Sequence, residues 1–187
     1  ISYDEDEEED YFTDDDITLY MPDIDQRNIG LPQYAPLIAE KIIKNCQAHE
    51  EALNLSTEAF KRFQTELTPQ QHEVALNWVL RTYSLFKFRA DDSLFKAIYM
   101  LNEVLCRQDV PFTKLQLMAI VCIWIACKVE DNIHIPLSSL CLICSNQLTE
   151  QEIRKTEPEI VTILKYDLNP ETPLFFIRRF LNAIDAD

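Results

Sequence analysis

Cysteine and histidine are the residues of this sequence with the most obvious capacity for chemistry. Cys141 and Cys144 form a Cys-x-x-Cys pair, and His134 lies upstream of it. A structural zinc site needs four ligands and usually takes two such pairs, whereas this chain supplies one. His49, His72 and His134 are widely spaced and form no readable triad with a serine or cysteine nucleophile. We therefore expect buried, reduced thiols, and neither a metal site, nor a cofactor, nor a catalytic centre.

Carboxylates are concentrated near the N-terminus. Asp4–Asp10 is an unbroken acidic run, Asp14–Asp16 follows it, and Tyr11 and Phe12 lie between the two. Burial cannot tune carboxyl pKa values in a solvated segment, so paired acids for catalysis are not expected there. Self-repulsion predicts a disordered tail. The alternative is that its acidic and aromatic residues together engage a basic groove on a partner.

The net charge separates this tail from the rest of the chain. The 187 residues carry a formal charge of −15, and the first sixteen contain ten acids and no base, which leaves −5 for the remainder. Nucleic acid and anionic membranes attract clustered lysine and arginine, so neither is expected as a partner. A single glycine, Gly30, argues against hairpin-rich β folds and phosphate-binding loops.

The elements that position any site are organised around Lys114–Asp131, the longest apolar run. As a helix it has no polar face, so it must be buried among other helices. Thr113 is its expected N-cap, with Gln116 at the third helical position as in a capping box. The apolar part from Leu115 to Lys128 is shorter than the roughly 20 residues that a bilayer requires. A soluble all-α domain is therefore predicted.

Periodicity, caps and prolines predict the remaining helices. Pro158 is expected to kink one of them near Glu157, because it removes a backbone hydrogen bond and clashes with the preceding turn. The expected helices are Leu37 to about Ala52, a short one from Thr57 to Gln64, Pro69 to Phe86, one capped by Asp91 or Asp92 and reaching Leu105, Pro136 to Cys144, one opened by the Thr149–Glu152 capping box, and Leu174 to Ile184.

Six segments, in this order and spacing, resemble the cyclin box of A/B-type cyclins. They are LNWVL (76–80), SLFKAIYMLN (93–102), KLQLMAI (114–120), IACKVED (125–131), LTEQEIRKTEPEIVTILKYDL (148–168) and PLFFIRRF (173–180). The resemblance implies a five-helix box with a buried central helix, an N-terminal docking helix, and a C-terminal helix leading toward a second box. It divides the chain into an acidic tail and linker (1–30), the N-terminal helix and its connection (31–67), the box (68–168), and a linker with the start of a following helical domain (169–187).

The same resemblance implies a non-catalytic regulatory subunit that binds and activates a cyclin-dependent protein kinase in cell-cycle control. Lys128 and Glu157 match the family's lysine and glutamate that hydrogen-bond to the kinase. Further kinase contacts are implied for Tyr34 and Ile38 of the N-terminal helix, and for Val129, Glu130, Ile163, Leu164, Tyr166 and Leu168. The alternative is a cyclin-fold scaffold or transcription-related adaptor that activates no cell-cycle kinase. An intracellular location, nuclear or cytoplasmic, is expected.

Two structural positions depart from the family pattern. The buried arginine and aspartate that tie the first box helix to the second correspond to His72 and Asn102. A hydrogen bond from imidazole to amide can replace that ion pair at a lower desolvation cost. Val129 stands where an aromatic residue is usual, so its kinase contact should be smaller. Trp124 is expected to be buried in the central helix.

The family's substrate-docking patch is also altered. Its Met-Arg-Ala-Ile-Leu motif corresponds to residues 71–75, which include Gln71, Val74 and Ala75, while Trp78 and Gln116 remain. Arg81 stands where the family carries an acid that receives a basic residue of the docking peptide. Because like charges repel, docking of the usual Arg-x-Leu peptides is expected to be weak or changed.

Overall fold

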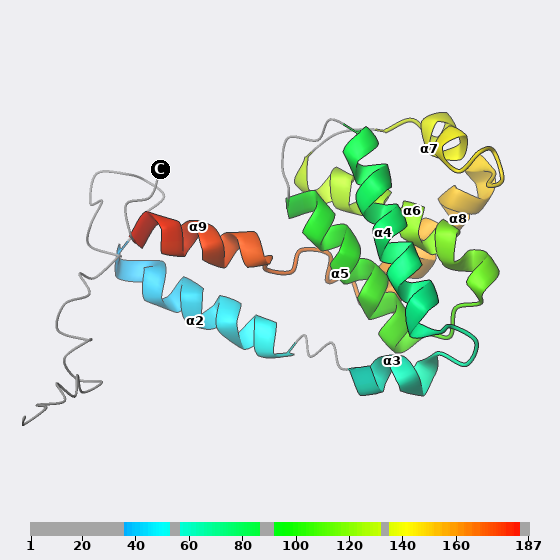
Figure 1. The fold of residues 1–187 in the computed structure, drawn as a ribbon. Helices are drawn as coiled ribbons and strands as arrows, with labels where there is room; N and C mark the ends of the chain where they lie inside the picture. Colours follow the sequence, from blue (N-terminus) through cyan, green and yellow to red (C-terminus); the bar gives the residue numbers. More distant parts are fainter. Residues whose placement is uncertain (1–35, 53–56, 87–91, 132–134, 184–187) are drawn as a thin grey trace, which may run out of the picture.

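The structure is a computed structural model that describes residues 36–52, 57–86, 92–131 and 135–183. Within these ranges the chain forms helices and no strand (Figure 1). The helices are α2 (Pro36–Ala52), α3 (Thr57–Phe63), α4 (Pro69–Leu85), α5 (Asp92–Arg107), α6 (Phe112–Glu130), α7 (Leu137–Ile143), α8 (Glu150–Ile163) and α9 (Pro173–Ala183). The all-α prediction is confirmed.

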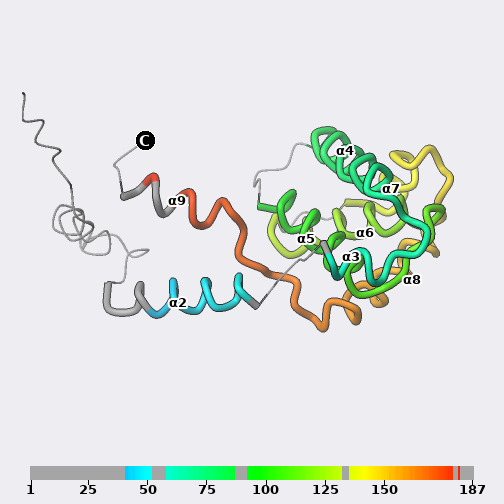
Figure 2. The backbone as a smooth tube through the Cα atoms, turned by 60° about the horizontal axis from the view of Figure 1, so that its bottom comes forward, coloured from blue at the N-terminus to red at the C-terminus, as the bar shows by residue number. Residues whose placement is uncertain are grey.

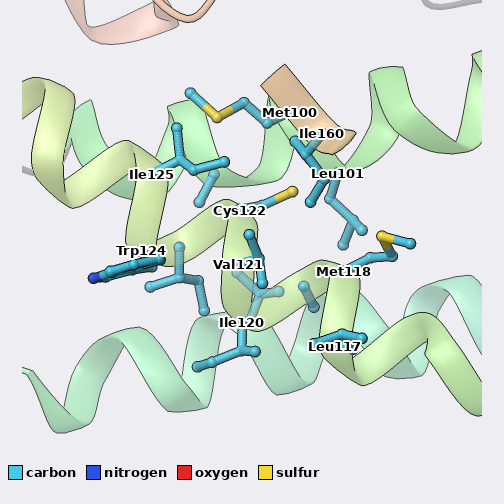
Figure 3. Close-up of a cluster of buried hydrophobic side chains, with 14 of the residues drawn as sticks. Met100, Leu101, Leu117, Met118, Ile120, Val121, Cys122, Trp124, Ile125 and Ile160 are labelled. Carbon is cyan, nitrogen blue, oxygen red and sulfur yellow. The ribbon is translucent and has the colours of Figure 1, made fainter. Parts of the chain in front are cut away.

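The centre of the fold is α6, which packs against α4, α5 and α8 (Figures 1 and 2). Every residue from Leu117 to Cys127 is buried. Figure 3 shows Met100 and Leu101 of α5 and Ile160 of α8 beside the apolar side chains of α6. The fold is therefore built around one enclosed helix, as the apolar run predicts.

By length and composition α6 could also cross a membrane, since it has 19 residues. The sequence-based estimate of its apolar length was too short to show this. Most of the helix is buried inside the domain, and the core helix of a soluble protein meets the same two criteria. Its burial, and not its length, is what identifies α6 as a core helix.

Two capping boxes fix the starts of α4 and α8. The Thr68 hydroxyl accepts from the Gln71 backbone N–H, and the Gln71 side chain accepts from the Thr68 N–H. Thr149 and Glu152 make the same reciprocal pair, as predicted. Downstream, α8 continues as one helix past Pro158.

The predicted capping box of α6 was wrong. The helix begins at Phe112, after Pro111, and no side chain caps it. Thr113 is therefore already inside the first turn, where its backbone is helical and cannot adopt the extended conformation of an N-cap. The side chain of Gln116 is consequently free for another role.

Gln64, which lies outside the predicted box (68–168), hydrogen-bonds to backbone groups at the end of α5 and in the turn after it. The Gln64 amide nitrogen donates to the carbonyl oxygens of Leu105 at 2.5 Å and Gln108 at 2.6 Å, and its oxygen accepts from the Val110 N–H at 3.2 Å. The last carbonyls of a helix have no partner within the helix. Gln64 thus satisfies three backbone groups in the turn between α5 and α6, and α3 packs on α5 beside it.

Two helices end in turns with left-handed backbone but without glycine. Ser145 and Asn146 follow α7, and Lys165 and Tyr166 follow α8, all with φ between 54° and 65°. Each turn is closed by a hydrogen bond across five residues, such as that from the Tyr166 N–H to the Val161 carbonyl at 3.0 Å. Left-handed backbone costs a non-glycine residue roughly 1–2 kcal/mol. The turn after α8 places Tyr166 on the surface.

The outer helices α2 and α9 lie to one side of the bundle (Figures 1 and 2). Asp92, the first residue of α5, accepts hydrogen bonds from Thr172 at 2.5 Å and Arg178 at 2.7 Å. Burial by itself would raise the pKa of Asp92, but these hydrogen bonds and the nearby cations outweigh it and lower the pKa. Asp92 therefore anchors the segment leading into α9. The other predicted cap, Asp91, lies outside the described residues.

Candidate partner-binding site

Lys128, near the end of α6, forms an ion pair with Glu157 of α8. Both side chains are about one-third exposed. The two residues are 29 positions apart in the chain and meet because α6 packs against α8. A cation and an anion are thus presented together at the surface, where they can bind backbone and side-chain groups of another protein.

The Trp124 ring packs against the Lys128 ammonium of this ion pair. The Lys128 ammonium lies 3.6 Å from the centroid of the Trp124 ring, a distance suited to a cation–π interaction. Trp124 is only 5% exposed, and its indole N–H donates to the Ile135 carbonyl at 3.2 Å. The predicted burial of Trp124 is confirmed, and the ring fixes the position of the charge above it.

The next two residues of α6 differ in their surroundings. Val129 is exposed beside Lys128. Glu130 forms an ion pair with Lys96 of α5, a lysine whose ammonium also donates to Asn169 at 2.5 Å. Lys96 is buried, so this pair joins α5, α6 and the segment after α8. Glu130 thus has a structural partner, while Val129 is available for contact with another protein.

The four predicted contact residues near the end of α8 do not lie together on the surface. Tyr166 is 75% exposed, whereas Leu164 is 1% exposed and belongs to the core. Ile163 and Leu168 are half-buried and pack against that core. The expectation for Leu164 needs correction, because the last turn of α8 directs this side chain inward. Tyr166 remains the prominent surface residue of the four.

The predicted contacts of the N-terminal helix cannot be located. Tyr34 lies outside the described residues, and the Ile38 side chain, although Ile38 is in α2, lies outside the described part as well. What the structure shows of α2 is its far end, where His49 lies between two carboxylates. One ring nitrogen contacts Glu171, and the other lies 3.1 Å from Asp167. No sequence pattern pointed to this contact.

A second surface feature is a groove between α4 and α6. Its volume is about 320 Å³. It brings together five of the six residues predicted for the docking patch, namely Gln71, Val74, Ala75, Trp78 and Gln116. Phe112 and Leu115 of α6 and Gln147 complete much of the wall. The sixth predicted residue, Arg81, is exposed on α4 and does not line the groove.

His72 and Asn102 connect α4 to α5 as expected from the sequence. A ring nitrogen of His72 lies 2.7 Å from the Asn102 side-chain oxygen. The His72 ring also packs on Phe60 of α3, with the ring centroids 5.1 Å apart. These three helices therefore meet at one histidine.

The cysteines show the surroundings of structural thiols. Burial is the main factor that raises the pKa of Cys127 to about 12 and that of Cys144 to about 11. Thiols with such pKa values are unreactive near neutral pH. In the described ranges no group of three or more Cys, His, Asp or Glu side chains is placed to hold a metal ion, and His134 lies outside those ranges.

Comparison with known proteins identifies the family of this chain. Residues 41–169 match the model of the cyclin N-terminal domain. The chain belongs to the cyclin family. Cyclin-B2-1 of Oryza sativa subsp. japonica is 28% identical over 175 residues, covering 94% of this cyclin and 41% of that relative. Cyclin-A1-4 of the same rice is 26% identical over 164 residues, covering 88% and 46%. The resemblance to A/B-type cyclins is confirmed.

A D-type cyclin and a solved cyclin structure are also similar to this chain. The G1/S-specific cyclin-D1 of Canis lupus familiaris is 27% identical over 151 residues, covering 80% of this cyclin and 50% of the dog protein. Among solved structures, a viral cyclin from herpesvirus saimiri superposes with a TM-score of 0.70 at 21% identity, covering 78% of this chain and 63% of that one. The cyclin-box fold is thus shown. The chain spans about two fifths to one half of the curated relatives named here.

Proposed function

We propose that this cyclin is a regulatory subunit that binds and activates a cyclin-dependent protein kinase, and that the face around Lys128 is where the kinase binds. The observation that carries the proposal is the pairing of Lys128 with Glu157 on top of a buried tryptophan. Family membership makes a kinase the expected partner. The chain itself would supply binding free energy and no chemistry.

Several features support this face as an interaction surface. Val129 and Tyr166 are exposed apolar or aromatic residues that the domain does not need for its own core. Tyr166 also has a left-handed backbone, a cost that tends to be retained where a side chain must be presented. Activation means favouring one kinase conformation. A shift from 1:99 to 99:1 requires about 5.5 kcal/mol of differential affinity, which an interface of standard size, about 1,600 Å², can supply.

The proposal extends to the organisation of the longer protein. The box and its N-terminal helix would be followed by a second cyclin box.

The protein would act inside the cell, in the nucleus or cytoplasm. Fractionation of cells with an antibody to the chain tests the location. Exclusive recovery from the medium would contradict it.

The decisive experiment measures binding to a panel of purified cyclin-dependent kinases. Lys128→Ala with Glu157→Ala should abolish co-purification and kinase activation. A matched control replaces another exposed lysine and glutamate, Lys61→Ala with Glu58→Ala in α3, and should leave both unchanged. Equal binding by both double variants would show that the kinase does not use this face.

A further inference from the structure

The groove between α4 and α6 leaves large apolar side chains in water. Val74 of α4 is 64% exposed and Phe112 of α6 is 51% exposed, and both line the groove together with Trp78 of α4. Single exposed apolar residues are ordinary, but several that share one hollow mark a binding surface. The charges around the groove indicate the chemistry of the segment that binds there.

Charge around the groove favours an acidic occupant over a basic one. The polar residues of its wall are neutral, mainly the amides of Gln71, Gln116 and Gln147. The charged residues next to the lining are Glu73, which precedes Val74, and Lys114, between Thr113 and Leu115. Arg81 lies further along the same face of α4 as Val74, because a spacing of seven residues makes almost two full helical turns. Arg81 is exposed and forms no ion pair with any described residue. With two cations and one acid around a neutral lining, a ligand of this groove should combine apolar side chains with a net negative charge.

The chain contains a segment of that composition outside the described residues. Residues 4–16 carry ten acids and no base, and in their middle stands Asp10-Tyr11-Phe12-Thr13-Asp14. Two adjacent aromatic rings with carboxylates on both sides match an apolar, uncharged groove that has Arg81 outside its lining on the same face of α4. We propose that residues 4–16 dock in this groove of their own chain, with Tyr11 and Phe12 covering its apolar wall and the flanking acids facing Arg81.

Because the acidic segment is tethered to the domain that carries the groove, even weak binding can fill the groove for much of the time. The 24 residues from Phe12 to Pro36 extend to at most about 80 Å, and as a random coil they span roughly 25–30 Å. A random-coil tether gives an effective concentration on the order of 1 mM when its span matches the distance to be bridged. A segment with an intrinsic dissociation constant of about 1 mM would then occupy the groove about half of the time. Any external peptide would have to displace it.

This docking is separate from the proposed kinase contact. Phe112 and Lys128 are 16 residues apart on α6, which at 1.5 Å per residue is about 24 Å along the helix. Substitutions in the tail and in the groove should therefore leave kinase binding unchanged. Failure of the docking proposal does not affect the kinase proposal, and the reverse also holds.

The test uses the indole N–H signals in two-dimensional NMR spectra of the full chain. Trp78 lines the groove and Trp124 is buried elsewhere, so one reports and the other is an internal control. Tyr11→Ser with Phe12→Ser should shift the Trp78 signal and leave the Trp124 signal in place. Tyr20→Ser, which changes an aromatic residue outside the acidic segment, should shift neither.

A second comparison isolates the charge contribution. In an Arg81→Glu background the Trp78 shift caused by Tyr11→Ser with Phe12→Ser should largely disappear, because the acids no longer face a cation. Arg154→Glu, on exposed α8 surface, should preserve the shift. An unchanged Trp78 signal in the Tyr11→Ser and Phe12→Ser chain would overturn the proposal. So would a shift that grows with protein concentration, since the tail would then occupy a second copy.

Discussion

Lys128 and Glu157 form an ion pair across the contact between α6 and α8, and a partner that uses both groups either binds the intact pair or separates it. The cost of separation is small, because an ion pair about one-third exposed contributes only roughly 0.2–1 kcal/mol. That is well below the free energy needed to shift a kinase between states. The pair therefore holds the two side chains in position without opposing their use.

The Lys128 and Glu157 double alanine variant should fold normally. Its free energy of unfolding should fall by less than about 1 kcal/mol, since the pair is partly solvated. Kinase affinity should fall at least about tenfold, because charged groups buried at an interface contribute more than surface pairs. Urea denaturation and calorimetric titration measure the two effects. A stability loss of several kcal/mol would mean that the pair is structural.

Trp124 should be far more important for stability. Trp124→Ala removes a buried ring and its hydrogen bond to Ile135, so the free energy of unfolding should fall by about 3–5 kcal/mol. Leu142→Ala is the control, because Leu142 is an exposed leucine and its loss should change stability by less than about 0.5 kcal/mol. Similar effects of both substitutions would contradict the assignment of Trp124 to the core.

The hydrogen bond between His72 and Asn102 should appear as a coupling energy. His72→Ala, Asn102→Ala and the double variant form a cycle, and the coupling should be about 0.5–1.5 kcal/mol, as for a typical protein hydrogen bond. Chemical denaturation of the four proteins measures it. Asn77→Ala, at an exposed position of α4, gives the background. Additive effects of the two substitutions would mean that the bond contributes nothing.

Attachment of α2 should depend on pH through His49. Both ring nitrogens face carboxylates, which only accept hydrogen bonds, so the contacts require the imidazolium form. Hydrogen bonding to Glu171 and then to Asp167 raises the pKa of His49 above its ordinary value of 6.5. A raised folded-state pKa gives stabilisation that is complete below pH 6.5 and lost as the pH rises through the folded-state value.

Other groups around this contact define its charge. Cys46 of α2 hydrogen-bonds to Glu171, and burial, followed by that carboxylate, raises the thiol pKa. Asp167 in turn faces Tyr99 and Glu103 of α5. Hydrogen exchange of the α2 amides should therefore accelerate above pH 6.5, relative to the intrinsic rate. In His49→Gln the protection should be lower and independent of pH. Equal pH dependence in both proteins would exclude His49 as the cause.

Patterns within single helices predicted much of this structure. Apolar residues on every side of one stretch identified α6, and Thr149 with Glu152 identified the start of α8. Resemblance to the family paired His72 with Asn102, and this pair is predictable because it depends on which helices pack together. The resemblance singled out Lys128 and Glu157 as kinase contacts but did not predict the ion pair between them. Thr113 was misplaced because Pro111 starts the helix earlier than the apolar pattern indicates.

Contacts between distant segments could not be predicted in the same way. His49 and Glu171 are 122 positions apart, and Asp92 and Arg178 are 86 apart. Neither pair shares a helix face or a motif, so only the assembled fold brings the residues together. Leu164 was misjudged for a related reason: matching a family position does not state which way the side chain turns, and here it enters the core.

The role of Gln64 sets a lower limit on how far the chain can be shortened. Its amide is the partner of two carbonyls and one N–H of the α5–α6 turn, and Thr65 adds two hydrogen bonds to Asp109 close by. A recombinant fragment starting at α4 would leave these backbone groups without hydrogen-bond partners. The smallest piece that can be expected to crystallise or to give sharp NMR lines therefore contains Gln64, and it should also contain α3, which packs on α5.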